Sequence, residues 1–212
     1  MPFPRPYPLS FYRRDTAVVA RDLLGCRLTR GFPDGKKLAV VIVETEAYLG
    51  VKDRAAHTWN GRKTPRVAPM WGPGGHAYVY FVYGMHHCLN VVTQREGVPE
   101  AVLLRAAVSE EWWRERGTEE KRKISSKVNS KKIFLFSGPA KLCAYLQVTT
   151  ALSGASLSGP ELQISRGSRR DFDVLVGPRV GVAYAGAAAA WPLRFAVADC
   201  RAVTSRRGLL TS

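Results

Sequence analysis

The sequence lacks the patterns that mark membrane-spanning, secreted and metal-binding proteins. No apolar run reaches about 18 residues, so no membrane-spanning helix is expected. The Pro-rich start, residues 1–8, has no apolar signal core. No two of the four cysteines form a Cys-x-x-Cys pair, which disfavours structural zinc and fits buried thiols in a reducing compartment. The cysteines are Cys26, Cys88, Cys143 and Cys200.

Several catalytic motifs are also missing. The chain has no P-loop, no Gly-x-Gly-x-x-Gly after a predicted strand, no Gly-x-Ser-x-Gly and no zinc-deaminase signature. These absences disfavour nucleotide hydrolysis, dinucleotide-dependent redox chemistry, serine hydrolysis and zinc deamination. The adjacent pair His86-His87 would point to opposite faces of a strand, a poor arrangement for metal ligands. We therefore expect neither a cofactor nor a metal.

Acidic residues are scarce relative to basic ones. The 212 residues include 32 Lys and Arg but only 17 Asp and Glu, which gives a formal net charge of +15. Such an excess favours an anionic partner, either nucleic acid or a membrane surface. The hydrophobic content of 46% is ample for the core of one folded domain.

Hydrophobic periodicity and turn signals predict a single mixed α+β domain. Asp15 is a candidate N-cap for a helix that stops at Gly25. Further helices are expected to begin at Ser109 and near Pro139, and residues 50–75 form a loop rich in Gly and Pro. We expect strands at 26–31, 36–48, 77–82, 87–93, 101–108, 162–165, 179–183 and 193–197. Residues 1–9 would form an extended arm, 10–205 the domain and 206–212 a tail.

Two carboxylates stand at the end of an otherwise apolar strand. Leu38 to Val43 is entirely apolar, but the strand continues into Glu44, Glu46 and Tyr48. Because side chains alternate along a strand, these three would share a face, where a carboxylate is costly unless it is paired or used. For Glu44 we favour pairing with arginines beside the sheet. For Glu46 we favour a role as a base that orients and deprotonates water.

Aromatic side chains gather on both sides of the Gly- and Pro-rich loop. Strand aromatics are most often core residues, but Tyr48, His57, Tyr80 and Tyr83 could form a stacking cage for a flat base, above all a cationic one. Tyr83 lies beside Gly84 at a predicted hairpin tip. A tip is an unusual place for a core residue and a suitable one for a wedge inserted between base pairs.

Basic residues near these aromatics suit a nucleic-acid backbone. A charge run such as residues 114–132 is usually a solvated face, but the total excess favours phosphate binding. Lys141 lies in the first turn of a predicted helix after Gly138-Pro139, where a phosphate is well placed. The other candidates around the loop are Arg62, Lys63 and Arg66.

An ordered set of motifs resembles the alkyladenine (3-methyladenine) DNA glycosylase family. Each motif alone is weak, but together they run in family order across roughly residues 10–200. The matching stretches are Val43–Gly50, Ala55–His57, Gly61–Arg66, Tyr78–Met85, Asn90, Val102–Arg105, Ser137–Leu142 and Pro192–Phe195. The chain departs from the family pattern at His86-His87, around Val98-Pro99-Glu100, and over residues 121–136.

The resemblance implies the fold and a role for each matched residue. It implies one α+β domain with a curved antiparallel sheet, surrounding helices and a protruding β-hairpin that inserts into DNA. Glu46 would activate water, and Arg105 would help fix that water and the carboxylate. The base pocket would comprise Tyr48, His57, Tyr80 and Asn90, which rejects the exocyclic amine of normal guanine. Tyr83 would fill the gap left by the flipped base. The backbone contacts would be Arg62, Thr64, Met85 and Lys141.

The resemblance also implies a partner and a reaction. The partner would be double-stranded DNA with an alkylated or deaminated purine, flipped from the duplex before its N-glycosidic bond is hydrolysed. No lysine lies in the pocket motifs, so we expect a monofunctional enzyme that leaves an abasic site. We expect a monomer without an obligate protein partner or membrane contact, located with intracellular DNA: cytoplasm or nucleoid in a bacterium, nucleus in a eukaryote. The alternatives are a non-catalytic lesion-binding module, an RNA-binding or RNA-modifying protein and a basic scaffold protein.

Overall fold

The computed structural model describes residues 5–115, 134–168 and 171–211. Most of the predicted basic segment, from 116 to 133, lies outside these residues, as do positions 1–4 of the predicted arm. The α-helices are α1 (Leu9–Tyr12), α2 (Thr16–Asp22), α3 (Glu110–Glu115) and α5 (Pro139–Leu146). The 3-10 helices are η1 (Gly50–Lys52), η2 (Trp59–Gly61), η3 (Pro65–Trp71), η4 (Thr150–Leu152) and η5 (Ala183–Ala190).

Ten strands of the described chain form one large, open antiparallel sheet. They are β1 (Arg27–Gly31), β2 (Lys37–Tyr48), β3 (Ala77–Val82), β4 (His86–Thr93), β5 (Glu100–Ser109), β6 (Leu135–Ser137), β7 (Leu162–Ser165), β8 (Val174–Gly177), β9 (Arg194–Val197) and β10 (Leu210–Thr211). The main path runs β10-β8-β9-β2-β5-β4-β3, while β1 joins β2 to β7 and β6 pairs with β5. The predicted mixed α+β architecture with an antiparallel sheet is therefore confirmed.

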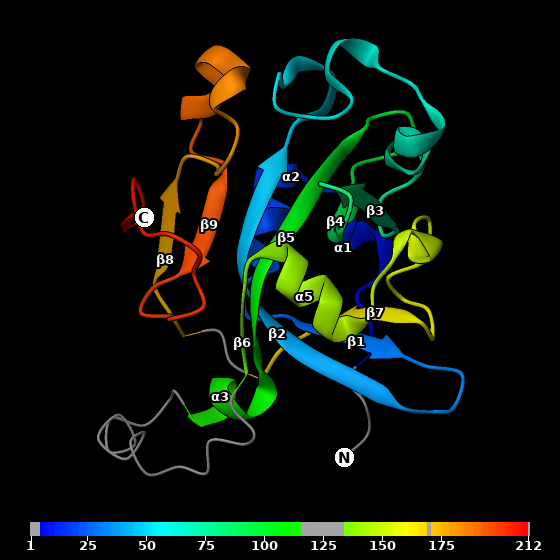
Figure 1. The fold of residues 1–212 in the computed structure, drawn as a ribbon, viewed down its shortest axis with the longest axis vertical. Coiled ribbons are helices and arrows are strands. Elements are labelled where there is room, and N and C mark those ends of the chain that lie inside the picture. The colour runs from blue at the N-terminus through cyan, green and yellow to red at the C-terminus, as the bar shows by residue number, and fades with distance from the viewer. Residues whose placement is uncertain (1–4, 116–133, 169–170, 212) are drawn as a thin grey trace.

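The long strands β2 and β5 form the centre of the sheet, and β9 and β8 continue it on the far side of β2 (Figure 1). One edge of β2 serves two neighbours, because its first half pairs with β1 and its second half with β9. The register between β2 and β5 shifts on either side of Glu44. Such irregularities re-aim side chains locally, and here they fall among the carboxylates that end β2.

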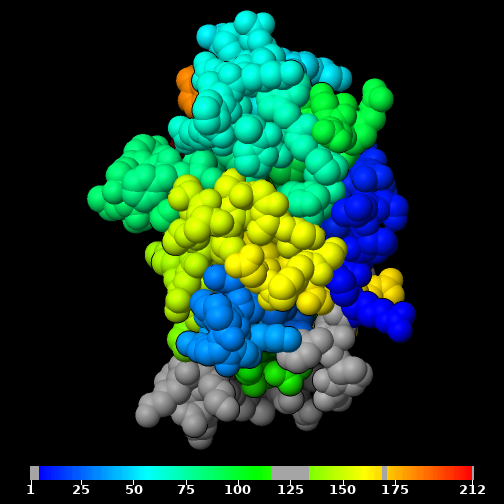
Figure 2. Space-filling model, turned by 90° about the vertical axis from the view of Figure 1, so that its right-hand side faces the viewer, coloured from blue at the N-terminus to red at the C-terminus, as the bar shows by residue number. Residues whose placement is uncertain are grey.

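Strands β3 and β4 form a hairpin whose turn projects from the body of the molecule (Figure 2). Tyr83 and Gly84 have φ angles of 54° and 68°, which is the left-handed geometry that tight hairpin turns require. Tyr83 is 86% exposed and Met85 is 70% exposed. The hairpin predicted from sequence is therefore present, and its tip presents two large apolar side chains to solvent.

The main hydrophobic core lies between the sheet and the helices that pack on it. Asp15 caps α2 by accepting a hydrogen bond from the Val18 N–H (3.0 Å), and the Thr45 hydroxyl donates to the Ala20 carbonyl (2.8 Å), joining α2 to β2. In the view of Figure 1, α2 lies behind β2, and α5 lies in front of β5. The largest fully buried apolar side chains include Trp113, Tyr12, Leu23, Leu28, Leu89, Leu104 and Leu142.

One predicted strand is wrong. Residues 179–183 do not form a strand, and the preceding segment Val174–Gly177 takes that place as β8. Arg179 instead turns into the interior, where it pairs with Asp53. Two terminal segments join the sheet, since Leu210–Thr211 pairs with β8 and the Tyr7 N–H donates to the Ile164 carbonyl at 3.0 Å. None of the helices in the described ranges is long and apolar enough to cross a membrane.

Candidate active site

Glu46 is a fully buried carboxylate near the end of β2, and polar partners hold both of its oxygens. Its Oε2 accepts a hydrogen bond from the Tyr48 hydroxyl at 2.9 Å. Its Oε1 accepts one from the backbone N–H of Val180 at 2.7 Å and lies 3.4 Å from Nη1 of Arg105. This set of donors fixes the orientation of the carboxylate from three sides.

The surroundings of Glu46 keep it a better base than an ordinary glutamate. Burial raises the pKa of Glu46, while Arg105, the Val180 N–H and the Tyr48 hydroxyl oppose that rise. Burial and the neighbouring Glu46 raise the pKa of Tyr48, so its phenol stays protonated and remains a donor. A carboxylate with a raised pKa accepts a proton more readily, which suits general-base chemistry.

Glu44 is a second buried carboxylate on β2, and it pairs with two arginines. Its Oε1 accepts hydrogen bonds from Nε of Arg105 (3.1 Å), Nε of Arg194 (2.7 Å) and the Thr204 hydroxyl (2.9 Å). Burial lowers the pKa of Arg105, but Glu46 and Glu44 outweigh this effect and raise it. The two carboxylates and two guanidinium groups balance in charge, and the prediction that Glu44 pairs with arginines is confirmed.

Tyr48 is held from behind by a second buried ion pair. The Arg179 guanidinium lies 4.7 Å from the centroid of the Tyr48 ring, and it donates to both carboxylate oxygens of Asp53. It also donates to the Ala47 carbonyl at 3.0 Å. Because the next residue, Val180, bonds Glu46, the Arg179-Val180 segment holds the three consecutive residues 46–48.

A cluster of aromatic rings lies on β3 and the preceding loop. His57 Nδ1 is 2.8 Å from the Tyr78 hydroxyl, and the His57 ring stands edge-on to Tyr80 with centroids 4.6 Å apart. Burial lowers the pKa of His57 to about 4, helped by Arg66 and Arg62, so the ring is neutral near pH 7. The Arg66 guanidinium lies 5.3 Å from the centroid of the Tyr80 ring.

The carboxylate and the aromatic cluster lie on one face of the sheet. Glu46 pairs with Leu103, Leu103 with Asn90, and Asn90 with Tyr78, so these residues form a single row across β2, β5, β4 and β3. Paired residues of an antiparallel sheet point to the same side. Neighbouring strands are about 4.8 Å apart, which puts the backbones of Glu46 and Asn90 roughly 10 Å apart. The Asn90 amide donates to the Tyr78 carbonyl at 3.1 Å.

Comparisons with known proteins match almost the whole chain. The model of the "Methylpurine-DNA glycosylase (MPG)" family matches residues 10–201. The chain belongs to this family.

Three relatives are each provisionally named as a 3-methyladenine DNA glycosylase. The protein of Desulfitobacterium hafniense is 42% identical over 92% of this chain and 96% of its own. That of Clostridium acetobutylicum is 39% identical over 92% of this chain and 95% of its own. That of Methanocella arvoryzae is 44% identical over 89% of this chain and 90% of its own.

The remaining residues predicted to contact DNA lie on the exterior of this methylpurine-DNA glycosylase family member. Tyr83 and Met85 occupy the hairpin tip. Arg62 and Thr64 are exposed in the loop between η2 and η3, and Lys141 is exposed in the first turn of α5. The structure thus brings Glu46, Tyr48 and Arg105 into contact, and His57 and Tyr80 into contact.

Sequence reasoning missed several residues that shape the site. They are Asp53, Arg179 and the Val180 N–H; the last two lie far from Glu46 in sequence, and their bonds to Asp53 and Glu46 join residues 126 and 134 positions apart. Arg194 falls inside a matched motif, but only the structure shows its bond to Glu44.

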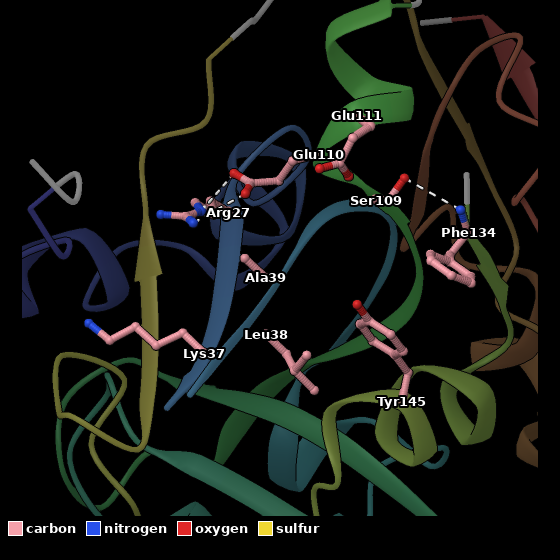
Figure 3. A pocket seen from close by; sticks show the side chains of 9 residues that line it. All are labelled: Arg27, Lys37, Leu38, Ala39, Ser109, Glu110, Glu111, Phe134 and Tyr145. Carbon is pink, nitrogen blue, oxygen red and sulfur yellow. Dashed lines mark hydrogen bonds and ion pairs between the residues drawn. The ribbon is translucent and has the colours of Figure 1, made fainter. Parts of the chain in front are cut away.

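The described chain also has a pocket at the other end of β2. Its volume is about 410 Å³, and it lies between the first residues of β2, α3 and α5 (Figure 3). Arg27 is paired there with Glu110 (2.7 Å), and the Ser109 hydroxyl accepts a hydrogen bond from the Phe134 N–H (3.4 Å). From Leu38 to Glu46 is roughly 25 Å along an extended strand, so this pocket is separate from the Glu46 site.

Proposed function

We propose that this protein is a monofunctional DNA glycosylase for alkylated or deaminated purines. The observation that carries the proposal is Glu46, a buried carboxylate held by three donors on the same sheet face as the aromatic cluster. Family membership and the names of the relatives support a DNA substrate. The net charge of +15 supports a phosphate-rich partner.

In the proposed reaction, the damaged nucleotide leaves the duplex and its base enters between Tyr48, His57 and Tyr80. Extrusion costs a few kcal/mol, less for a damaged base, and Tyr83 fills the space left in the stack. The neutral His57 adds no positive charge that would repel a cationic alkylated base. Asn90, in the same row as Glu46, would face the base edge and reject the amine of normal guanine.

Bond cleavage would follow from the position of Glu46. As the glycosidic bond breaks, positive charge develops on the sugar, and the carboxylate stabilises it. Glu46 takes a proton from water, the water oxygen bonds to the anomeric carbon, and the base departs with the bonding electrons. Arg105 holds Glu46 and the attacking water. Among the described residues that touch Glu46 or the aromatic cluster, none is a lysine, which supports water as the nucleophile.

The decisive experiment is single-turnover cleavage of duplex DNA with one ethenoadenine or hypoxanthine. Wild-type protein should produce abasic sites, whereas Glu46→Gln should bind the same duplex but release no base. Glu110→Gln is a matched control, because it removes a carboxylate whose partner, Arg27, lies at the other end of β2. Strands should break only after alkali, and borohydride should trap no covalent complex.

The outcomes separate the alternatives. Tight lesion binding without base release by wild type would favour a binding module that acts within DNA repair. Preference for single-stranded RNA over the lesion duplex would favour an RNA-binding protein. Equal release of the damaged base by wild type and Glu46→Gln would support a glycosylase whose catalytic base is a residue other than Glu46.

A further inference from the structure

Arg105 reaches Glu46 with only one of its three guanidinium nitrogens, and the other two are held by residues behind it. Nε donates to Glu44 at 3.1 Å, and Nη2 donates to the Thr204 hydroxyl at 3.2 Å. The contact of Nη1 with Glu46 is longer, at 3.4 Å. Because a guanidinium group is rigid and planar, the two shorter contacts set the direction of Nη1.

Thr204 is the centre of the arrangement behind Arg105. Its backbone N–H donates to Oε2 of Glu44 (2.9 Å), and its hydroxyl donates to Oε1 of the same carboxylate (2.9 Å). The hydroxyl also accepts from Nη2 of Arg105 (3.2 Å) and from Nη2 of Arg194 (3.5 Å). One hydroxyl thereby uses its single donor and both acceptor positions.

The segment that carries Thr204 lies beyond the family match, which ends at residue 201. Ala202 and Val203 are buried and fix this segment to the core, whereas Thr204 is half-buried and Ser205 is exposed. The Ser205 carbonyl accepts a hydrogen bond from Arg194. Residues 204–205 therefore stand between the buried charges of Glu44, Arg105 and Arg194 and solvent.

We propose that Thr204 is a positioning residue of the active site, whose hydroxyl orients Arg105 toward Glu46. This inference rests on the proposed glycosylase function. Thr204 touches neither Glu46 nor the aromatic cluster in any contact described above, so its effect reaches the reaction through Arg105. Loss of the hydroxyl removes the Nη2 partner of Arg105 and one donor to Glu44, so that the bond to Glu44 and the longer contact with Glu46 alone set the direction of the guanidinium group.

The test compares Thr204→Val with Thr204→Ser. Valine keeps the shape and the backbone N–H but lacks the hydroxyl, whereas serine keeps the hydroxyl. Thr211→Val is the matched control, because Thr211 is an exposed threonine near the same end of the chain, on β10. Single-turnover excision of ethenoadenine should fall about tenfold in Thr204→Val, a typical effect of losing a hydrogen bond to a charged group. Thr204→Ser and Thr211→Val should stay within about twofold of wild type.

Two further measurements separate positioning from a structural role. The Kd for the lesion duplex should change little in Thr204→Val, because the base pocket is intact. The pH–rate profile should move, since Arg105 lowers the pKa of Glu46 and its displacement lets that pKa rise further. The other groups near Glu46 are Tyr48, Glu44, Tyr80 and Cys88 and the Val180 N–H; the variant replaces none of them, and Glu44 loses one of its donors. The acid limb should therefore lie at higher pH than in wild type.

Each outcome decides between the proposals. No excision by wild type would overturn the proposed function. Active wild type with an equally active Thr204→Val would overturn the inference alone. Equal loss in the valine and serine variants with a lowered Tm would show that the threonine serves only packing, and would also overturn the inference.

Discussion

Asp53→Asn should destabilise the fold far more than the loss of one surface ion pair. Asp53 is fully buried and accepts hydrogen bonds from both Arg179 nitrogens Nη1 and Nη2 and from the N–H groups of Leu49 and Ala55, at 3.0 Å each for the two backbone donors. An asparagine offers an amide NH2 in place of one oxygen, so donors would face donors on that side. Arg179, also buried, would keep its charge without a counter-ion.

The expected cost follows from this burial. Removing one partner of a buried ion pair costs about 3–5 kcal/mol, because an uncompensated charge stays in the interior. A chain of this length loses about 2–4 °C in Tm for each kcal/mol, so Tm should fall on the order of 10 °C. The loss is a large part of the about 5–15 kcal/mol that stabilises a typical domain.

The assay is thermal and urea unfolding at neutral pH of wild type, Asp53→Asn and Asp22→Asn. Asp22 is the matched control, since it also pairs with an arginine, Arg14, at 2.8 Å, but both side chains are nearly 40% exposed. That pair should contribute less than about 1 kcal/mol. If Asp53→Asn unfolds with the same free energy as Asp22→Asn, the buried pair is not what holds Arg179 behind Tyr48.

Three further predictions concern pH and the hairpin. The single-turnover excision rate should rise with pH along an acid limb above pH 4.5, because burial raises the pKa of Glu46, the proposed base; a limb at or below 4.5 would contradict this. Wild type should lose about 3 kcal/mol of stability relative to His57→Gln as pH falls from 6.5 to 4, because His57 is protonated in the unfolded chain at a higher pH than in the folded protein, where its pKa is about 4. Urea unfolding at several pH values measures this, and an equal change in the free energy of unfolding for both proteins would refute it. Tyr83→Gly should keep or raise Tm, because glycine adopts the positive φ of this position without the strain of about 1 kcal/mol that tyrosine carries. The same change should weaken binding of the lesion duplex by tenfold or more, and an unchanged Kd would exclude insertion by Tyr83.

Local signals allowed much of the fold to be predicted. The strand that ends in Glu46 was visible because an apolar run continues into carboxylates, and β2 spans Lys37–Tyr48 against a predicted 36–48. The Asp15 cap and the turn at Tyr83-Gly84 depend on neighbouring residues only, and both are present.

The partners of the buried charges could not be predicted, because they depend on which distant segments meet. Residues 179–183 alternate valine with small or charged residues, which predicted a strand. The buried ion pair between Arg179 and Asp53 outweighs the strand propensity of this segment. Nothing near Arg179 in the sequence reveals that its partner is Asp53. The register shifts around Glu44 likewise arise from pairing with β5. Thr204 had no motif to mark it, since its importance lies entirely in three charged neighbours from β2, β5 and β9.

The contacts of Glu44 have a consequence for how the protein is made. They join residues separated by 61, 150 and 160 positions, and the last partner, Thr204, follows β9 in the chain. A nascent chain cannot close this arrangement before residue 204 has left the ribosome, however well its first strands have paired. Glu44 therefore meets its full set of partners only after all of the strands from β1 to β9 have been made.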